Sequence, residues 1–300
     1  MKLNEIYAIA NQFAPKGLSD AYCAAYGAYD NSGVLVDTGD EIVGIVFSLD
    51  LSFAAIDRAL QEGANLIITH HPAMYGKINH ARCDADDLTE RKLVKCLKNG
   101  ISVISMHLNL DMADGGIDEC LALGVSTAAY YTDFILKAQD MLLQGAFGQP
   151  LPTEEDVVTG ALASVKNAVK MHTVEGGAYG RAYDIPAISL DGLQTEIKEY
   201  MSAARVNVYG DLQRTVKRVA SFCGAGADEG TVRFAVKQGA DVIVSSDFKH
   251  HVITNALESG LSVIELTHYA SENYGFRKYY EKIRQLVDVS CYFHEDSNLL

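Results

Sequence analysis

The amino-acid sequence predicts an α/β fold built from two similar halves, each with a mainly parallel sheet flanked by helices. Short apolar runs rich in Val and Ile are bounded by glycine or charged residues, which is typical of strands buried on both faces. Amphipathic helical patterns separate these runs and end at glycine, as helix C-caps do. With 300 residues, 48% of them hydrophobic and 21% charged, the chain is long enough to bury such a core.

The predicted strands fall into two sets of three. In the first set, helical patterns at 52–63 and 88–100 connect the strands. Parallel neighbours need crossover connections of this kind, so we expect mostly parallel pairing. The strands span 41–49, 65–70 and 101–107 in the first set, and 216–223, 241–246 and 261–268 in the second.

The two sets also resemble each other in order. Residues 54–71 align with 231–247, and residues 96–111 align with 256–272. Each copy contains helix, glycine turn and strand, and each strand ends in polar residues. Any two α/β units share part of this pattern, but the shared order and turn chemistry favour an internal duplication. In either case the polar ends lie where open α/β sheets bind ligands.

Composition divides the chain into three segments. We expect a first α/β half at 1–125, a connecting segment at 126–190 and a second α/β half at 191–300. Two of the five prolines fall in 144–156, which predicts a surface connection. A capping-box pattern then predicts a helix that starts at Thr153.

Charge and cysteine usage exclude several function classes. The formal net charge is −14, which disfavours binding to nucleic acid or to an anionic membrane surface. Six cysteines without a CxxC spacing indicate free thiols in a reducing compartment. No apolar run reaches the ~18 residues of a membrane span, and Asn and Glu near the start argue against a signal peptide. We therefore expect a cytoplasmic protein that does not bind membranes.

Imidazole and carboxylate side chains gather at the predicted strand ends. Four of the nine histidines even occur as adjacent pairs. A single histidine at a strand end is more often an ordinary surface or core residue than a ligand, but four such ends together favour a metal site. The residues are His70 and His71, His107 and Asp111, Asp247 with His250 and His251, and His268 with Glu272.

This ligand chemistry suits a divalent ion such as Zn, Fe, Mn, Co or Ni. Adjacent histidines indicate one ligand for each of two ions, which in hydrolases lie about 3.5–4 Å apart with a bridging carboxylate. We therefore expect two divalent ions per chain and the two halves packed around them. With one bridging carboxylate, each ion has three protein ligands and an open position, as in catalytic sites. The expected ligands are His70, His71, Asp111, His268 and Glu272.

Three further residues are candidates for holding those ligands or moving protons: His107, Asp247 and His251. His250 is interpreted as the solvent-side neighbour of His251.

Two weaker signals are glycine-rich. Residues 223–230 (CGAGADEG) imitate a phosphate-binding loop, but the spacing and the acidic Asp228 favour a tight structural turn. Arg181, in a second glycine-rich stretch, could meet an anion or lie in an ordinary turn.

Several segments together resemble the NGG-interacting-factor-like family. These are dinuclear-metal, ring-forming proteins often labelled GTP cyclohydrolase 1 type 2 homologs. The matching segments are ITHHP, HLNLD followed by GG, SDFKHH, THYASE, YDNSGVLV at 29–36 and VKRVASFCGAG at 216–226. The resemblance covers roughly 1–125 and 174–285. It implies the same five metal ligands and a homohexameric ring of dimers.

The sequence departs from the family pattern at a few positions. Ser246 stands where glycine is usual, and His250 stands where an aromatic residue is usual. The middle segment is longer than in short members and too short for the extra domain of long ones. The five ligand positions are unchanged, so these departures concern access to the site and choice of substrate.

Two functions follow from this interpretation. The first is a metal-dependent hydrolase that uses a bridging hydroxide on a small anionic or nucleotide-like substrate, with His251 or His107 moving protons. The alternative is a non-catalytic, metal-binding, ring-shaped scaffold or adaptor. A cytoplasmic homohexamer that binds a small molecule fits both, whereas nucleic acid inside a ring conflicts with the acidic charge.

Overall fold

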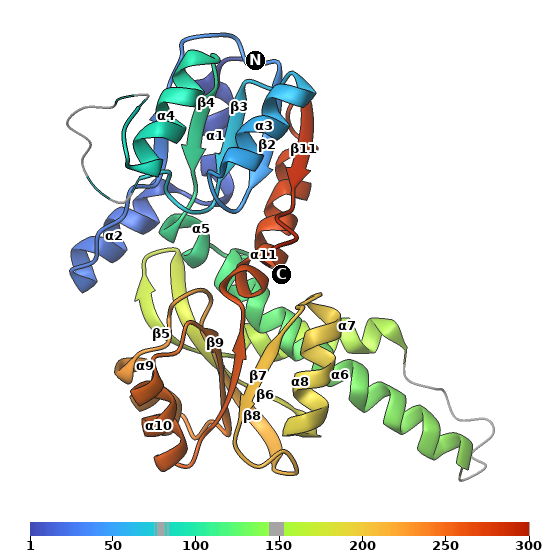
Figure 1. Ribbon diagram of the computed structural model, residues 1–300. Helices are drawn as coiled ribbons and strands as arrows, with labels where there is room; N and C mark the ends of the chain where they lie inside the picture. The colour runs from blue at the N-terminus through green and yellow to red at the C-terminus, as the bar shows by residue number, and fades with distance from the viewer. Residues whose placement is uncertain (75, 77–81, 83, 144–152, 300) are drawn as a thin grey trace. The chain divides into compact units, whose positions relative to one another are not determined.

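The computed structural model describes residues 1–299 except 75, 77–81, 83 and 144–152 (Figure 1). Most of the predicted surface connection at 144–156 therefore lies outside the described residues. The α/β prediction is confirmed, since the described strands form a five-stranded and a six-stranded sheet flanked by helices. The chain forms two compact units. The first contains Met1–Ile117, Thr173–Ala178 and Gly275–Ser297, and the second contains Asp118–His172, Tyr179–Tyr274 and 298–299.

The sheet of the first unit has the order β1-β4-β3-β2-β11. Pairing is parallel from β4 to β11, and β1 joins β4 antiparallel. Every residue of β2, β3 and β4 is buried, as their apolar sequences predict. The strands are β1 (Gly33–Val36), β2 (Gly44–Ser48), β3 (Leu66–Thr69), β4 (Ser102–Ser105) and β11 (Ser290–His294).

Helices cover both faces of this sheet. On one face α3 and α4 pack over Val46, Ile67 and Val103. On the other, Phe47 meets aromatic rings of α11, including Phe276 at 6.2 Å. The helices with residues in this unit are α1 (Leu3–Phe13), α2 (Lys16–Tyr26), α3 (Phe53–Glu62), α4 (Leu88–Lys98), α5 (Leu108–Met112) and α11 (His268–Ile283).

Local sequence explains where the crossover helices begin and end. Ser52 caps α3 by accepting a hydrogen bond from the Ala55 N–H, and Gly63 ends it in the left-handed conformation at φ +66°. Asp87 caps α4 in the same way through the Glu90 N–H. These crossovers carry the chain back so that β3 and β4 both end at one edge of the sheet, as expected for parallel strands.

The second sheet has the order β5-β6-β8-β9-β10-β7. Its centre, β8-β9-β10, is parallel and matches the second predicted set, while β6 and β7 pair antiparallel at either side of this centre. Strands from the predicted connecting segment therefore enlarge this sheet. The strands are β5 (Val169–Val174), β6 (Gly177–Ser189), β7 (Val206–Tyr209), β8 (Thr215–Ser221), β9 (Val242–Ser246) and β10 (Ser262–Leu266).

Helices α9 and α10 pack over this sheet as α3 and α4 do in the first unit. A capping box between Thr153 and Asp156 starts α7, as predicted. The helices of this unit, besides the start of α11, are α6 (Ile117–Leu143), α7 (Glu154–Lys166), α8 (Leu190–Tyr200), α9 (Glu229–Lys237) and α10 (His250–Glu258). Across the described residues, no helix is long and apolar enough to cross a membrane.

Candidate metal centre

In the first unit, the chain turns sharply where β3 ends, and this turn brings two histidines together. The N–H groups of His70 and His71 both donate to the Leu49 carbonyl, at 3.2 and 2.9 Å. Hydroxyl groups of Thr69 and Ser105 donate to the His71 carbonyl, at 2.7 and 3.2 Å. Neighbours in a straight strand point to opposite faces, but after this turn the two imidazole centroids lie only 4.9 Å apart.

The end of β4 adds His107 and Asp111 to this cluster. His107 precedes the short helix α5, and Asp111 lies one turn later on it. The His107 ring lies 5.3 Å from the ring of His70, and Asp111 Oδ1 lies 3.5 Å from His70 Nε2. Nitrogen atoms of His70, His71 and His107 all lie within 4.8 Å of one another, a spacing at which they could hold a metal ion. The first unit thus brings four of the predicted residues together.

Each of the three imidazole rings is held at Nδ1. His70 Nδ1 donates to the Met106 carbonyl at 2.8 Å. A carbonyl oxygen can only accept a hydrogen bond, so Nδ1 must be the protonated nitrogen of this ring. His71 Nδ1 is 2.9 Å from Asp50 Oδ1, and His107 Nδ1 is 2.7 Å from Asp30 Oδ1. With Nδ1 protonated, the lone pair of each neutral ring lies on Nε2. Metal-binding histidines are oriented in this way by carbonyl and carboxylate acceptors.

Asp30 is the most strongly held of these acceptors. Its side chain is 1% exposed and also accepts hydrogen bonds of 2.5 Å from the hydroxyls of Ser19 and Ser32. Burial alone would raise the pKa of Asp30, but the hydrogen bonds from His107 and the two serines outweigh it and hold the pKa well below its usual range. Asp30 is therefore a buried carboxylate with a fixed negative charge.

In the second unit, the start of α11 presents His268 and Glu272 on one face, as their i,i+4 spacing predicts. His268 Nε2 lies 3.1 Å from Glu272 Oε2, and its Nδ1 lies 2.6 Å from Asp247 Oδ2. Asp247 adopts a left-handed backbone at φ +53°, which costs a non-glycine residue roughly 1–2 kcal/mol. The structure maintains this conformation at the residue that orients His268.

The second histidine pair differs from the first. His250 and His251 lie in the first turn of α10, and both are exposed. Neither belongs to the groups of described residues that could hold a metal ion. The expectation that His251 moves protons stays a prediction.

Two acceptors were not predicted from the sequence: Asp30 and Asp50. Asp50 lies two residues after the end of β2, so the rule that identified the other strand ends could have found it. Asp30 lies between α2 and β1, among turn-forming residues, and contacts His107 from 77 positions away. No local pattern indicates that contact.

The weaker sequence signals have structural explanations. Arg181 is fully buried in β6 and pairs with Asp118. It therefore lies in a strand and not in a turn, and its partner is a carboxylate of the chain itself. In the segment 223–230, Asp228 caps α9 by accepting from the Thr231 N–H. A carboxylate thus occupies the helix N-terminus where a phosphate-binding loop would place its ligand. The interpretation as a structural turn is confirmed.

The sequence pattern of Duf34/NIF3 (NGG1p interacting factor 3) matches residues 1–298. This chain belongs to the Duf34/NIF3 family. The resemblance noted in the sequence is therefore confirmed.

Relatives in the Duf34/NIF3 family include the GTP cyclohydrolase 1 type 2 homolog of Clostridium perfringens, 28% identical over 98% of this chain and 95% of that protein. The homolog of Bacillus subtilis is 27% identical over 89% of this chain and 88% of its own. A Bacillus cereus protein related to NIF3 has the same fold, with a TM-score of 0.69 at 20% identity, covering 98% and 96% of the two chains. The structure of reduced HcgD from Methanocaldococcus jannaschii has a TM-score of 0.72 at 24% identity, covering 99% of this chain and 98% of that chain.

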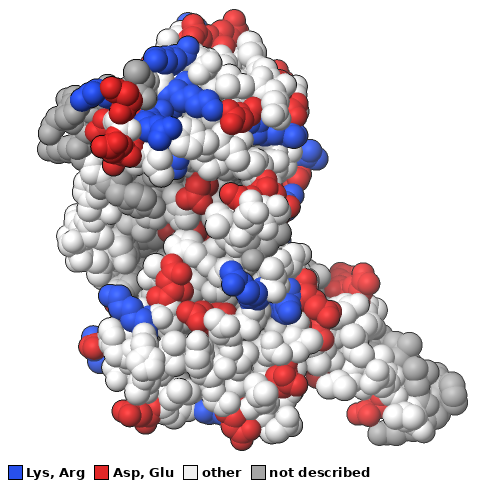
Figure 2. Space-filling view, viewed as in Figure 1, with Lys and Arg blue, Asp and Glu red and all other residues white. Residues whose placement is uncertain are grey.

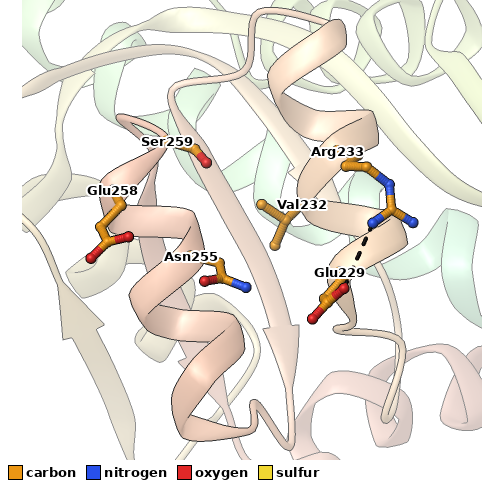
Figure 3. A pocket seen from close by; sticks show the side chains of 6 residues that line it. All are labelled: Glu229, Val232, Arg233, Asn255, Glu258 and Ser259. Atoms are coloured by element: carbon orange, nitrogen blue, oxygen red, sulfur yellow. Dashed lines mark ion pairs between the residues drawn. The ribbon is translucent and has the colours of Figure 1, made fainter.

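Two other surface features of this Duf34/NIF3 chain, within its described residues, differ in chemistry from the histidine cluster. A cavity of about 450 Å³ lies between α9 and α10 (Figure 3), and its lining contains no imidazole. Of its charged residues Glu229, Arg233 and Glu258, the first two pair with each other at 3.8 Å. Figure 2 shows basic side chains over α4. There Lys95 pairs with Asp57, and Arg91 and Lys95 lie 5.6 Å from the Phe53 ring centre.

Proposed function

We propose that this chain binds two divalent metal ions and hydrolyses a small anionic or nucleotide-like substrate. The observation that carries the proposal is the orientation of the candidate imidazole rings. His70, His71, His107 and His268 each have Nδ1 beside a carbonyl or carboxylate acceptor, which leaves the Nε2 lone pair to bind a metal ion or, at His107, to accept a proton. Four independent rings held in this way are hard to explain by packing alone, since packing does not require a common tautomer.

The donor atoms fit divalent transition metals. Neutral imidazole and carboxylate together suit Zn, Fe, Mn, Co or Ni, and no soft thiolate belongs to the groups of described residues that could hold an ion. We assign the metal-binding role to His70, His71, Asp111, His268 and Glu272. These are the five ligands that the sequence predicts, and their joining into one centre is part of the proposal.

The remaining residues have roles that follow from their contacts. The Met106 carbonyl, Asp50 and Asp247 hold the rings of His70, His71 and His268 in place. His107 is not needed as a ligand in this scheme, and its Nε2 can accept a proton while buried Asp30 stabilises the resulting imidazolium. His251 is the less favoured proton carrier because it is exposed at the start of α10. When bound, the ions would polarise the substrate and lower the pKa of a water molecule.

The names of the relatives suggest which substrate to test first. Curated relatives are labelled GTP cyclohydrolase 1 type 2 homologs, so GTP and related purine nucleotides head the panel. Cyclic imides, phosphoesters and peptides complete it. The family resemblance further implies a homohexamer, which the mass of the protein in solution will test.

The test uses the metal-loaded protein, its Asp111→Ala variant and a matched control, Asp114→Ala. Asp114 is an exposed carboxylate three residues away. We expect two ions per chain and turnover of one substrate class in the wild type and the control, and loss of both activity and metal in Asp111→Ala. Equal activity in all three proteins would show that the assignment is wrong. Two bound ions without turnover of any compound would favour the non-catalytic scaffold.

A further inference from the structure

The turn after β8, Cys223–Gly226, is held in one position by hydroxyl groups on both sides. The Gly224 N–H donates to Ser271 Oγ at 3.1 Å, on α11. The Gly224 carbonyl accepts from Ser246 Oγ at 2.6 Å and from Ser245 Oγ at 3.3 Å, on β9. All three serines are buried. Water therefore competes little with these bonds, and the Gly224 peptide is fixed against the start of α11.

Gly224 faces the two metal-binding candidates of the second unit. Its backbone is left-handed at φ +55°. A Cβ atom at this position would overlap Glu272 Oε1 and would lie 3.4 Å from His268 Nε2. The space that a side chain would fill is thus already occupied by the Glu272 carboxylate, which is 4% exposed.

The turn cannot easily move away from Glu272, because a buried ion pair anchors it from behind. Asp118 Oδ1 accepts from the Cys223 N–H at 3.4 Å. Asp118 Oδ2 accepts from the Gly180 N–H at 3.1 Å and pairs with Arg181. Both charged side chains are 0% exposed. Any shift of the turn would disturb this buried pair, so a clash at Gly224 has to be relieved by movement of Glu272.

We propose that Gly224 is a positioning residue for the metal-binding carboxylate of Glu272. Its missing side chain creates the space in which Glu272 lies 3.1 Å from His268. The inference rests on the proposed function, since it assigns Glu272 as a ligand. The segment 223–230 (CGAGADEG) would then have two roles: Asp228 caps α9, and Gly224 leaves space for the Glu272 carboxylate.

The experiment compares Gly224→Ala with Gly239→Ala by titration with Zn²⁺ or Co²⁺ and by metal analysis. Gly239 is also left-handed, at φ +65°, but no atom lies within 4 Å of the point that a Cβ atom would occupy there. Both variants therefore place alanine at a left-handed position, and only Gly224→Ala meets Glu272. We expect the wild type and Gly239→Ala to bind two ions alike. Gly224→Ala should bind at least one of them about 10–100-fold more weakly, the range seen when the groups that orient ligands are lost.

A shorter acid provides the rescue. Glu272→Asp withdraws the carboxylate by one methylene, so adding Gly224→Ala in that background should weaken metal binding much less than it does in the wild type. Equal binding by Gly224→Ala and Gly239→Ala would overturn the inference and leave the proposed function standing. A wild type that binds no ion would refute the proposed function itself.

Folding is measured in the same series. If Gly224→Ala does not fold, the double variant with Glu272→Ala decides the matter, because removing the clashing carboxylate should restore folding. A double variant that also fails to fold would show that the clash involves other atoms and that the inference is wrong.

Discussion

Asp30 and His107 are joined by a 2.7 Å hydrogen bond between Oδ1 and Nδ1, although 77 positions separate them in the sequence. The Ser32 hydroxyl accepts from the His107 N–H at 3.1 Å and donates to Asp30, so the ring and its backbone are both attached to the same carboxylate network. This network fixes the direction of His107 Nε2 before any ligand binds.

Asp30→Asn should make the protein less stable at neutral pH. Because the folded-state pKa of Asp30 is lowered, its contribution is fully present above the unfolded pKa of about 4 and is lost as pH falls through the lower folded value. Hydrogen bonds to a charged group are worth about 1.5–3 kcal/mol, and we expect a loss of that order in the free energy of unfolding. Urea unfolding at pH 7 and near pH 3 measures it, with exposed Asp40→Asn as control. A difference that does not shrink at low pH would contradict the prediction.

Asp50→Ala should weaken metal binding without much effect on folding. Asp50 orients His71 but its side chain is 46% exposed, so its removal leaves no buried charge. Loss of such an orienting carboxylate typically reduces metal affinity about 10–100-fold. Calorimetric titration with Zn²⁺ gives the affinity, and thermal unfolding of the apo protein provides the control. Unchanged affinity would show that the Asp50 contact does not support a ligand.

Removal of bound metal should lower the melting temperature. An ion that binds only the folded state, at a free concentration 100 times its dissociation constant, stabilises it by about 2.7 kcal/mol. Wild-type protein treated with a chelator should therefore unfold at a lower temperature and recover when Zn²⁺ or Mn²⁺ is returned. Asp111→Ala should show a smaller shift. Identical melting curves for chelated and loaded wild type would argue against a bound ion.

Replacing only one member of the buried pair Asp118 and Arg181 should greatly lower the free energy of unfolding. Asp118→Leu leaves the Arg181 guanidinium buried, with Glu119 at 3.1 Å as its remaining carboxylate partner among the described side chains. Breaking a buried pair costs about 3–5 kcal/mol, whereas replacing both members with apolar residues recovers much of that. Asp118→Leu with Arg181→Met should accordingly be more stable than Asp118→Leu alone in urea unfolding.

An exposed pair provides the control for that experiment. Arg277 and Glu295 lie 2.9 Å apart with side chains 45% and 42% exposed. Glu295→Ala should cost less than about 1 kcal/mol, since solvent screens the pair. A similar cost for the buried and the exposed variants would mean that burial of Arg181 does not determine the effect.

The central strands were predictable because full burial leaves a strong sequence signal. The apolar run at 65–70 became β3 (Leu66–Thr69), and the run at 241–246 became β9 (Val242–Ser246). The outer strands β5, β7 and β11 were missed because their residues are only partly buried and alternate weakly. In β11, for example, no residue is fully buried, so the run Ser290–His294 carries no clear period.

The site shows the same division. His70, His71 and His268 stand at strand ends, and strand ends can be located from local patterns. The carboxylates that orient the site histidines depend on which loops the fold brings together. Asp30, which orients His107, lies among turn-forming residues, and no local pattern marks it as a partner. Gly224 was visible as part of a glycine-rich turn, but only the overlap between a Cβ atom and Glu272 reveals why glycine is required there.

The strand order of the first sheet affects how the protein is made. Because β2 pairs with β11, and because Phe276 packs on Phe47, the N-terminal unit lacks an edge strand and part of its core until Ser290–His294 leave the ribosome. Apart from 298–299, the described part of the second unit, within Asp118–His172 and Tyr179–Tyr274, is synthesised before that point. The sheet of the first unit is therefore completed after the sheet of the second, and its β2 edge is open to other strands while the second sheet is being translated.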